Sequence, residues 1–306
     1  MPPAWSSISA PTTASDPLSR PLCRLFHPRF WRYHGGLAQR GQPVASILLF
    51  DSGMGGLSIY REVQRALPGH QYLYLFDNAC FPYGELSEQR LVSRVVELFD
   101  TFVSRYPVDI VVIACNTAST YVLPALRQRL QIPVVGVVPA IKPAAEHSRA
   151  YGHGRVGLLA TPGTVSRQYT ADLIRNFAAD LDVSAIGTTE LVKMAEDKLS
   201  GQGVDRQRLG RVLAPWLGVW RPDTVVLGCT HFPLLAEELR LWLPDTRLID
   251  SGEAIARRVA SLLSPEALPG QGERARLFCT EWTTKARLQA AAFAKEGFGE
   301  LQCLFP

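Results

Sequence analysis

The sequence has no long apolar run, and we expect no secretory leader. No stretch approaches the roughly 18 consecutive apolar residues of a membrane span, and the N-terminus lacks the basic-then-apolar order of a secretory signal. With 306 residues, 47% of them hydrophobic, the chain is nevertheless long enough for two modest cores. We therefore expect a soluble, cytoplasmic protein of two domains that does not contact membranes.

The six cysteines lack the spacing of a disulfide framework or of a metal site. They stand at positions 23, 80, 115, 229, 279 and 303, and no two of them form a CxxC pair. Only His231 lies within two residues of a cysteine, and no second pair of ligands accompanies it. We expect reduced thiols and no bound metal.

The motifs of common cofactor sites are also missing. The turn Asp51-Ser-Gly-Met-Gly-Gly56 has neither the glycine spacing of the dinucleotide fingerprint nor the lysine of a P-loop. None of the lysines stands in a recognisable Schiff-base setting, which disfavours a pyridoxal phosphate enzyme. We expect an activity that needs no cofactor.

Acidic residues are scarce at the start of the chain. Residues 1–45 hold five arginines and one acid, Asp16, and so account for the whole net charge of +4. A basic segment of this kind is more often a disordered extension than a binding arm. An arginine-rich, acid-poor start also occurs in organellar transit peptides, although the prolines argue against an amphipathic helix. We expect residues 1–45 to be a disordered basic tail.

What the chain does contain is an alternation of apolar strands and helical stretches. Strands are expected at 46–50, 71–77, 109–114, 134–138, 155–160, 181–186, 223–228 and 247–249. Helical spacing is found at 57–67, 85–106, 123–130 and 190–199. Continuous Val, Ile and Leu strands that alternate with helices are typical of parallel sheets covered on both faces, so the sequence predicts an α/β fold.

Two segments follow one plan and indicate two related halves. Ile110-Val-Val-Ile-Ala-Cys115-Asn-Thr117 and Thr224-Val-Val-Leu-Gly-Cys229-Thr-His231 each lead from a buried strand to a cysteine and two polar residues. The strand ends at Asp51 and Thr161 precede these cysteines by 64 and 68 residues. We predict two doubly wound, mostly parallel-sheet domains related by a pseudo-two-fold axis, one over residues 46–137 and 251–306 and one over residues 138–250. Because ligands bind beyond the carboxyl ends of parallel strands, both cysteines should face an active site in the cleft between the domains.

Two opposed thiols suit the inversion of an amino-acid α-carbon. One group must remove the proton from one face while a second donates to the other, and thiols can be tuned across neutral pH. A free cysteine at a strand end is usually a small buried hydrophobe, but the matched settings of Cys115 and Cys229 favour catalysis. Helix N-termini directly after both cysteines would favour the thiolate form, and His231 is placed to assist Cys229. We interpret Cys23, Cys80, Cys279 and Cys303 as tail, packing or surface residues.

Polar residues at the strand ends are candidates for substrate binding. Asp51 and Ser52 can cap the next helix, or they can hold the ammonium and carboxylate groups of a substrate. Asn116, Thr117 and Thr230 follow the cysteines, where short polar side chains and helix N–H groups bind carboxylates.

Two further segments are ordinary when taken alone. Pro82-Tyr83-Gly84 has the chemistry of a turn, and Glu196 lies in a predicted helix, where a charged residue normally faces solvent.

Four ordered motifs resemble the glutamate racemases. They are Asp51-Ser-Gly-Met-Gly-Gly-Leu-Ser58, Phe81-Pro-Tyr-Gly84, Ala114-Cys-Asn-Thr-Ala-Ser119 and Gly228-Cys-Thr-His-Phe-Pro-Leu234. The similarity runs from 47 to 263, roughly seven-tenths of the chain. The N-terminal extension, residues 137–143 and the segment 190–197 resemble the enterobacterial-type branch most.

The resemblance implies a cofactor-independent isomerase that interconverts L- and D-glutamate and supplies D-glutamate for peptidoglycan synthesis, and hence for cell wall biogenesis and cell shape. It implies catalysis by Cys115 and Cys229, with Asp51, His231 and Glu196 assisting proton transfer. Substrate binding is implied for Asp51, Ser52, Tyr83, Gly84, Asn116, Thr117, Thr230 and His231. The Glu196 helix departs from the family pattern, because Thr189 and Lys193 stand where prolines are commoner.

The resemblance also implies partners and leaves alternatives open. Enterobacterial-type members are activated by UDP-N-acetylmuramoyl-L-alanine, expected near the junction of the domains. Aspartate or hydantoin racemases and related decarboxylases share the architecture, although the Cys-Asn-Thr and Cys-Thr-His pair favours glutamate. Some glutamate racemases also resemble inhibitors of DNA gyrase, so gyrase binding is a possible second function of this chain. Only the basic tail indicates such a partner.

Overall fold

The computed structural model describes residues 44–263 and 274–305. The predicted disordered tail lies, up to residue 43, outside the described residues. Within the described parts of the chain, none of the helices combines the length and apolar character needed to cross a lipid bilayer.

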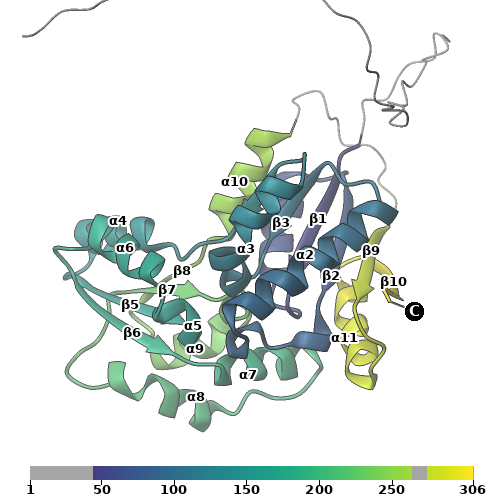
Figure 1. The fold of residues 1–306 in the computed structure, drawn as a ribbon. Coiled ribbons are helices and arrows are strands. Elements are labelled where there is room, and N and C mark those ends of the chain that lie inside the picture. The colour runs from purple at the N-terminus through teal and green to yellow at the C-terminus, as the bar shows by residue number, and fades with distance from the viewer. Residues whose placement is uncertain (1–43, 264–273, 306) are drawn as a thin grey trace, which may run out of the picture. The chain divides into compact units, whose positions relative to one another are not determined.

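Two sheets form the framework of the described residues (Figure 1). The first sheet has the order β10-β9-β2-β1-β3-β4, and its strands are β1 (Ser46–Asp51), β2 (Gln71–Phe76), β3 (Ile110–Ile113), β4 (Val134–Gly136), β9 (Ala275–Cys279) and β10 (Phe298–Cys303). The second has the order β6-β5-β7-β8, and its strands are β5 (Arg155–Ala160), β6 (Asp182–Gly187), β7 (Thr224–Gly228) and β8 (Arg247–Ile249). Every pairing in both sheets is parallel, which confirms the predicted α/β class.

The two sheets repeat one topology. The order β2-β1-β3-β4 in the first sheet equals the order β6-β5-β7-β8 in the second, so the strands before Cys115 and Cys229, β3 and β7, hold matching places. All eight predicted strands are confirmed, with shifts of at most two residues at their ends. Strands β9 and β10 were not predicted, and they extend the first sheet beyond β2.

Helices connect the strands and cover both faces of each sheet (Figure 1). The helices are α1 (Leu57–Ala66), α2 (Glu88–Arg105), α3 (Asn116–Arg129), α4 (Ile141–Tyr151), α5 (Pro162–Val165), α6 (Gln168–Phe177), α7 (Glu190–Leu199), α8 (Arg206–Leu213), α9 (Ala236–Trp242), α10 (Gly252–Leu262) and α11 (Thr284–Lys295). Short 3-10 helices occur at η1 (Asn78–Cys80), η2 (Tyr83–Glu85), η3 (Ala214–Trp216) and η4 (Phe232–Leu235). Helix α3 begins directly after Cys115, where a helix N-terminus was expected, and seven residues before the stretch with clear helical spacing, because its first turns consist largely of polar and β-branched residues that favour helices weakly.

Successive side chains along the strands of the first sheet pack alternately into two apolar cores, one on each face of the sheet. Ile47 and Leu49 of β1 pack in the core shared with α1, α10 and α11, whereas Leu48 and Phe50 pack in the core shared with α2 and α3. Each fully buried aliphatic or phenyl side chain contributes roughly 1.5–3 kcal/mol to folding. The helices packed on both faces fix the positions of the strand ends, and these ends carry polar residues.

Candidate active site

A small cavity lies between the carboxyl ends of the two sheets. Its volume is about 20 Å³, which is room for about one water molecule. The lining residues come from both halves: Ser52, Pro82, Tyr83, Gly84, Cys115, Asn116 and Thr117 from the first, and Thr161, Thr189, Val192, Cys229, Thr230 and His231 from the second. The structure therefore places nine of the predicted site residues around one cavity.

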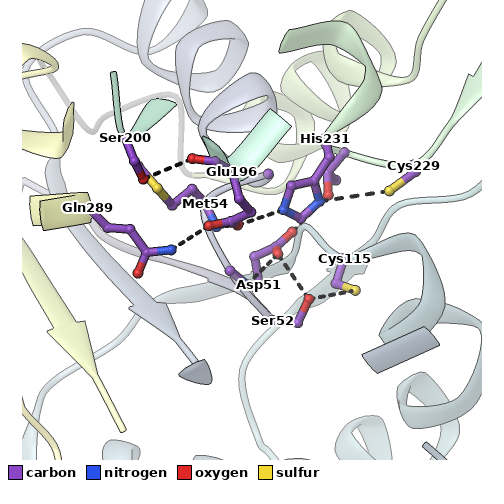
Figure 2. A network of polar contacts seen from close by, with 12 residues as sticks. Asp51, Ser52, Met54, Cys115, Glu196, Ser200, Cys229, His231 and Gln289 are labelled. Carbon is purple, nitrogen blue, oxygen red and sulfur yellow. Dashed lines mark hydrogen bonds and ion pairs between the residues drawn. The ribbon is translucent and has the colours of Figure 1, made fainter. Parts of the chain in front are cut away.

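Asp51 and Glu196 do not line this cavity but lie directly behind its wall. Both side chains are fully buried. Asp51 accepts a hydrogen bond from Thr230 Oγ1 at 2.9 Å, and Glu196 Oε1 lies 2.8 Å from His231 Nε2. Each carboxylate thus contacts a residue of the cavity wall (Figure 2).

The Cys115 thiol stands at the start of a helix. Cys115 is the N-cap of α3, and its sulfur accepts a hydrogen bond from the Ala118 N–H at 3.5 Å. Ser52 Oγ lies 3.9 Å from the same sulfur and 3.4 Å from Asp51 Oδ1. Burial, reinforced by the nearby Asp51 carboxylate, raises the pKa of Cys115 well above its ordinary value, against the opposing effect of the Ala118 N–H. The Cys115 side of the cavity therefore favours the neutral thiol.

The Cys229 thiol has a histidine and a carboxylate behind it. His231 Nδ1 lies 3.8 Å from Cys229 Sγ, and its other ring nitrogen meets Glu196. Burial alone lowers the pKa of His231, but the hydrogen bonds to Cys229 and Glu196 outweigh it and hold this pKa well above its ordinary value. An imidazolium placed between a carboxylate and a sulfur atom can donate to both.

The two carboxylates have pKa values shifted in opposite directions. Burial raises the pKa of Asp51, although His231 and the Gly53 N–H partly offset it. Burial also opposes ionisation of Glu196, but the hydrogen bond and charge of His231 and the Met54 N–H lower its pKa below the ordinary value. Glu196 is held as the ionised partner of His231.

The prediction of a helix N-terminus after each cysteine is right for Cys115 and wrong for Cys229. After Cys229, Thr230 and His231 lead into the 3-10 helix η4, and α9 begins only at Ala236. Pro233 lies within the first two positions of η4, where it can supply no backbone N–H. His231 therefore takes the place that a helix N-terminus has at Cys115.

The glycine-rich turn after β1 allows these groups to approach one another. A Cβ atom at Gly53 would collide with Glu196 Oε1, and one at Gly55 would collide with the His231 ring. Close approach of side chains explains this turn without a bound phosphate.

Tyr83 contributes its ring, rather than a free hydroxyl, to the cavity wall. Its hydroxyl donates to Asp77 Oδ2 at 2.7 Å, and Arg94 holds the same carboxylate through two further hydrogen bonds. Asn116 differs, because its Oδ1 is buried and has no hydrogen-bond partner among the described residues. This oxygen is a free acceptor at the cavity.

Sequence analysis missed four lining residues. Thr161, Thr189, Val192 and Pro82 join the predicted set in the cavity wall. Thr161 was noted as the counterpart of Asp51 in the repeat, and its hydroxyl lies 3.2 Å from that of Thr117 across the cavity. The repeat therefore carried enough information to identify Thr161.

Gln289 on α11 was also missed and lies outside the cavity wall. Its Nε2 donates to Glu196 Oε2. No sequence motif marked it. Among the described residues, no group of three His, Cys, Asp or Glu side chains is placed to hold a metal ion.

Comparisons with known proteins agree with this geometry. Residues 47–259 match the model of the Asp/Glu/Hydantoin racemase family. The glutamate racemase of Klebsiella pneumoniae (strain 342) is 52% identical over 270 residues, which cover 87% of this chain and 94% of that protein.

Solved structures give the same result. A crystal structure of Escherichia coli glutamate racemase in complex with L-glutamate and the activator UDP-MurNAc-ala is similar with a TM-score of 0.81 and 51% identity, over 86% of this chain and 99% of that chain. The glutamate racemase isoform RacE1 of Bacillus anthracis is similar with a TM-score of 0.71 and 29% identity, over 85% and 97% of the two chains. With the family model covering more than half of its length, this chain belongs to the Asp/Glu/hydantoin racemase family and, within it, to the glutamate racemases.

Proposed function

We propose that this protein interconverts L- and D-glutamate without a cofactor, with Cys115 and Cys229 as the acid and base on opposite faces of the substrate. The observation that carries the proposal is the pair of thiols at matching strand ends of two sheets, both lining one cavity. The identity of 52% to a glutamate racemase supports glutamate as the substrate.

The different settings of the two thiols fit opposite resting states. With L-glutamate bound, a Cys229 thiolate takes the α-proton and leaves a carbanion, and the neutral Cys115 thiol donates its proton to the other face. The new Cys115 thiolate is then stabilised by the Ala118 N–H and the Ser52 hydroxyl. The reverse reaction starts from the opposite protonation states, and His231 with Glu196 balances the charge at Cys229.

Polar groups of the wall suit an amino acid. The free Oδ1 of Asn116 can accept from the substrate ammonium group. The hydroxyls of Thr117 and Thr161, together with the start of α3, can donate to its carboxylates. Asp51, held by Thr230 and Gly53, adds negative charge beneath the ammonium site.

We also propose that the two sheets belong to separate domains, residues 46–137 with 251–306 and residues 138–250, which move apart to admit substrate. A cavity of about 20 Å³ is several times too small for glutamate. Besides the buried contacts of Asp51 and Glu196, exposed ion pairs join the two halves: Arg167 approaches Glu88 at 3.3 Å, and Lys193 approaches Glu85 at 3.8 Å. Such exposed ion pairs are worth little and are easily broken.

In the cell, the proposed role is to supply D-glutamate for peptidoglycan synthesis in the cytoplasm. The Escherichia coli relative has been solved with the activator UDP-MurNAc-ala. We propose that UDP-N-acetylmuramoyl-L-alanine also activates this protein by binding near the domain junction. A racemisation rate that does not change when this nucleotide is added would contradict the activation alone.

The direct test is racemisation of L-glutamate by the purified protein, with L-aspartate measured in parallel and no cofactor added. We expect D-glutamate to form until both enantiomers are equal, and little turnover of L-aspartate. Turnover of aspartate in place of glutamate would assign the chain to the aspartate branch of the family, and no turnover of either would refute the proposal.

A further inference from the structure

Gln289 is a buried amide that touches the catalytic network from outside the cavity. It lies on α11 between Ala286 and Phe293 on the buried face of that helix, and only 4% of its surface is exposed. Figure 2 shows it at the end of the network opposite Cys229, with Glu196 and His231 between them. Its Nε2 donates to Glu196 Oε2.

Packing alone does not explain a glutamine at this position. Its Oε1 is buried and has no hydrogen-bond partner among the described residues. Rotating the amide by half a turn would place Oε1 against the Glu196 carboxylate, so the orientation is set by the acceptor it faces. A buried acceptor without a partner destabilises the fold, and a methionine of similar size would avoid that cost. The amide therefore serves the group to which its nitrogen donates.

Glu196 depends on a complete set of donors to stay ionised. Its Oε1 accepts from the Met54 N–H at 2.7 Å and faces His231 Nε2 at 2.8 Å, so both contacts use the same oxygen. Among the described residues, Gln289 is the side chain that donates to the other oxygen, Oε2. Without this donor, Oε2 of a fully buried carboxylate would have no hydrogen-bond partner among the described residues, and the more distant charge of Lys285 would remain as its support on that side.

We propose that Gln289 is a positioning residue for the Cys229 half of the reaction: it holds Glu196 ionised and in place, and Glu196 in turn orients His231 toward the Cys229 sulfur. The inference rests on the proposed two-thiol racemisation. It assigns to the C-terminal helix α11 a role in proton transfer at one face of the substrate. Within the described parts of the chain, Cys115 has no such connection to α11, because Asp51 is held by Gly53, Ser52 and Thr230.

The test needs measurements that can tell the two faces apart. The equilibrium constant between enantiomers is one, so any variant lowers kcat/KM equally in both directions. An isotope effect is different: with α-deuterated L-glutamate it reports transfer to Cys229, and with α-deuterated D-glutamate it reports transfer to Cys115. If proton transfer at Cys229 becomes slower, the isotope effect with L-glutamate rises and the one with D-glutamate falls.

We would measure Gln289→Met in both directions and across pH. We expect kcat/KM to fall about tenfold and the acidic limb of its pH profile to move up by about one pH unit, because Glu196 loses a donor that favours its charged form. The isotope effect should rise with L-glutamate and fall with D-glutamate. The matched control is Phe293→Leu on the same helix face, which loses packing but should keep the wild-type pH profile and isotope effects.

Gln289→Glu keeps the volume of the side chain and decides the question even if Gln289→Met does not fold. A protonated carboxyl at position 289 can donate to Glu196, whereas an ionised one repels it, so the alkaline limb should move to lower pH. A pH profile and isotope effects identical to those of the wild-type enzyme in the Gln289→Glu variant would overturn the inference, whatever its melting temperature. Full activity of Cys229→Ala would instead refute the proposed function on which it rests.

Discussion

Cys115 and Cys229 follow corresponding strands of two sheets, but their sulfur atoms have different partners. Cys115 begins a long helix and is contacted by a backbone N–H and the Ser52 hydroxyl. Cys229 precedes a short 3-10 helix and is contacted by His231, which is paired with Glu196. The repeat of the fold places two thiols symmetrically, whereas their surroundings differ: burial and Asp51 raise the pKa of Cys115, and His231 provides a cation beside Cys229.

The carboxylates behind the two thiols show the same contrast. Glu196 has a lowered pKa because it forms a buried pair with His231, while Asp51 has a raised pKa because burial outweighs its hydrogen bonds. An enzyme that must begin with one thiol and one thiolate needs such a difference between its halves. Substitutions on the two sides should therefore differ in stability and pH dependence, although both reduce activity.

The largest effect is expected from removing either sulfur atom. Cys115→Ala and Cys229→Ala should each lower kcat/KM for both enantiomers by at least about 10²–10⁴-fold, because either direction needs one acid and one base. Initial rates with L- and D-glutamate measure this. Near-wild-type activity in either variant would overturn the two-base mechanism and the placement of the active site between the sheets.

Isosteric replacement of Glu196 and of Asp51 should change the melting temperature in opposite directions. Glu196→Gln leaves a buried His231 cation without its partner, so the melting temperature at pH 7 should fall by about 5–10 °C. Asp51→Asn removes a carboxylate that is costly to ionise in the fold, so its melting temperature should rise by about 3 °C. Both variants should lose activity, about 10–10²-fold.

Melting curves against pH check the sign of each effect. The lowered pKa of Glu196 stabilises the fold above about pH 4.5 and is lost as pH falls through the folded-state value, so Glu196→Gln should approach wild type in acid. The raised pKa of Asp51 has its full benefit below about pH 3.8 and is lost as pH rises through the folded-state value, so Asp51→Asn should gain on wild type toward neutral pH. Parallel curves for the two variants would contradict the proposed asymmetry.

The smallest effect is expected at a cysteine outside the network. Cys80 is half-buried and packs against the core beneath α2. Cys80→Ala should keep the racemisation rate within about threefold and lower stability by about 1 kcal/mol. A loss comparable to that of Cys115→Ala would show that sulfur chemistry extends beyond the two cavity thiols.

The sequence predicted the parts of the fold whose apolar pattern is local. All eight predicted runs are strands, and the inner strands β1, β3, β5 and β7, which are rich in Val, Ile and Leu, are buried on both faces. Strand β10 escaped prediction because it lies at the edge of the first sheet, where Gly299 and Glu300 interrupt the pattern. Strand β9 is short and contains Arg276, so its sequence does not read as a continuous apolar run.

The site was predictable where the chemistry lies beside a strand end and not where it depends on tertiary contacts. Cys115, Ser52 and His231 follow strands directly, so their convergence could be inferred. Glu196 lies in a helix in which a charged side chain normally faces solvent, and only packing against the turn after β1 shows that it is buried. Gln289 is a single amide in an alanine-rich helix, and its contact with Glu196 spans 93 residues.

The most direct test of the central claim, that the two thiols serve opposite faces of the substrate, follows solvent deuterium. In D2O, wild-type enzyme given L-glutamate should place deuterium at the α-carbon of the D-product, because Cys115 donates a solvent-exchanged proton. L-glutamate recovered early in the reaction should remain largely unlabelled, because the proton held by Cys229 returns to the face it left. D-glutamate that keeps the original α-hydrogen, or L-glutamate labelled as fast as product forms, would show that one group serves both faces and would contradict the account.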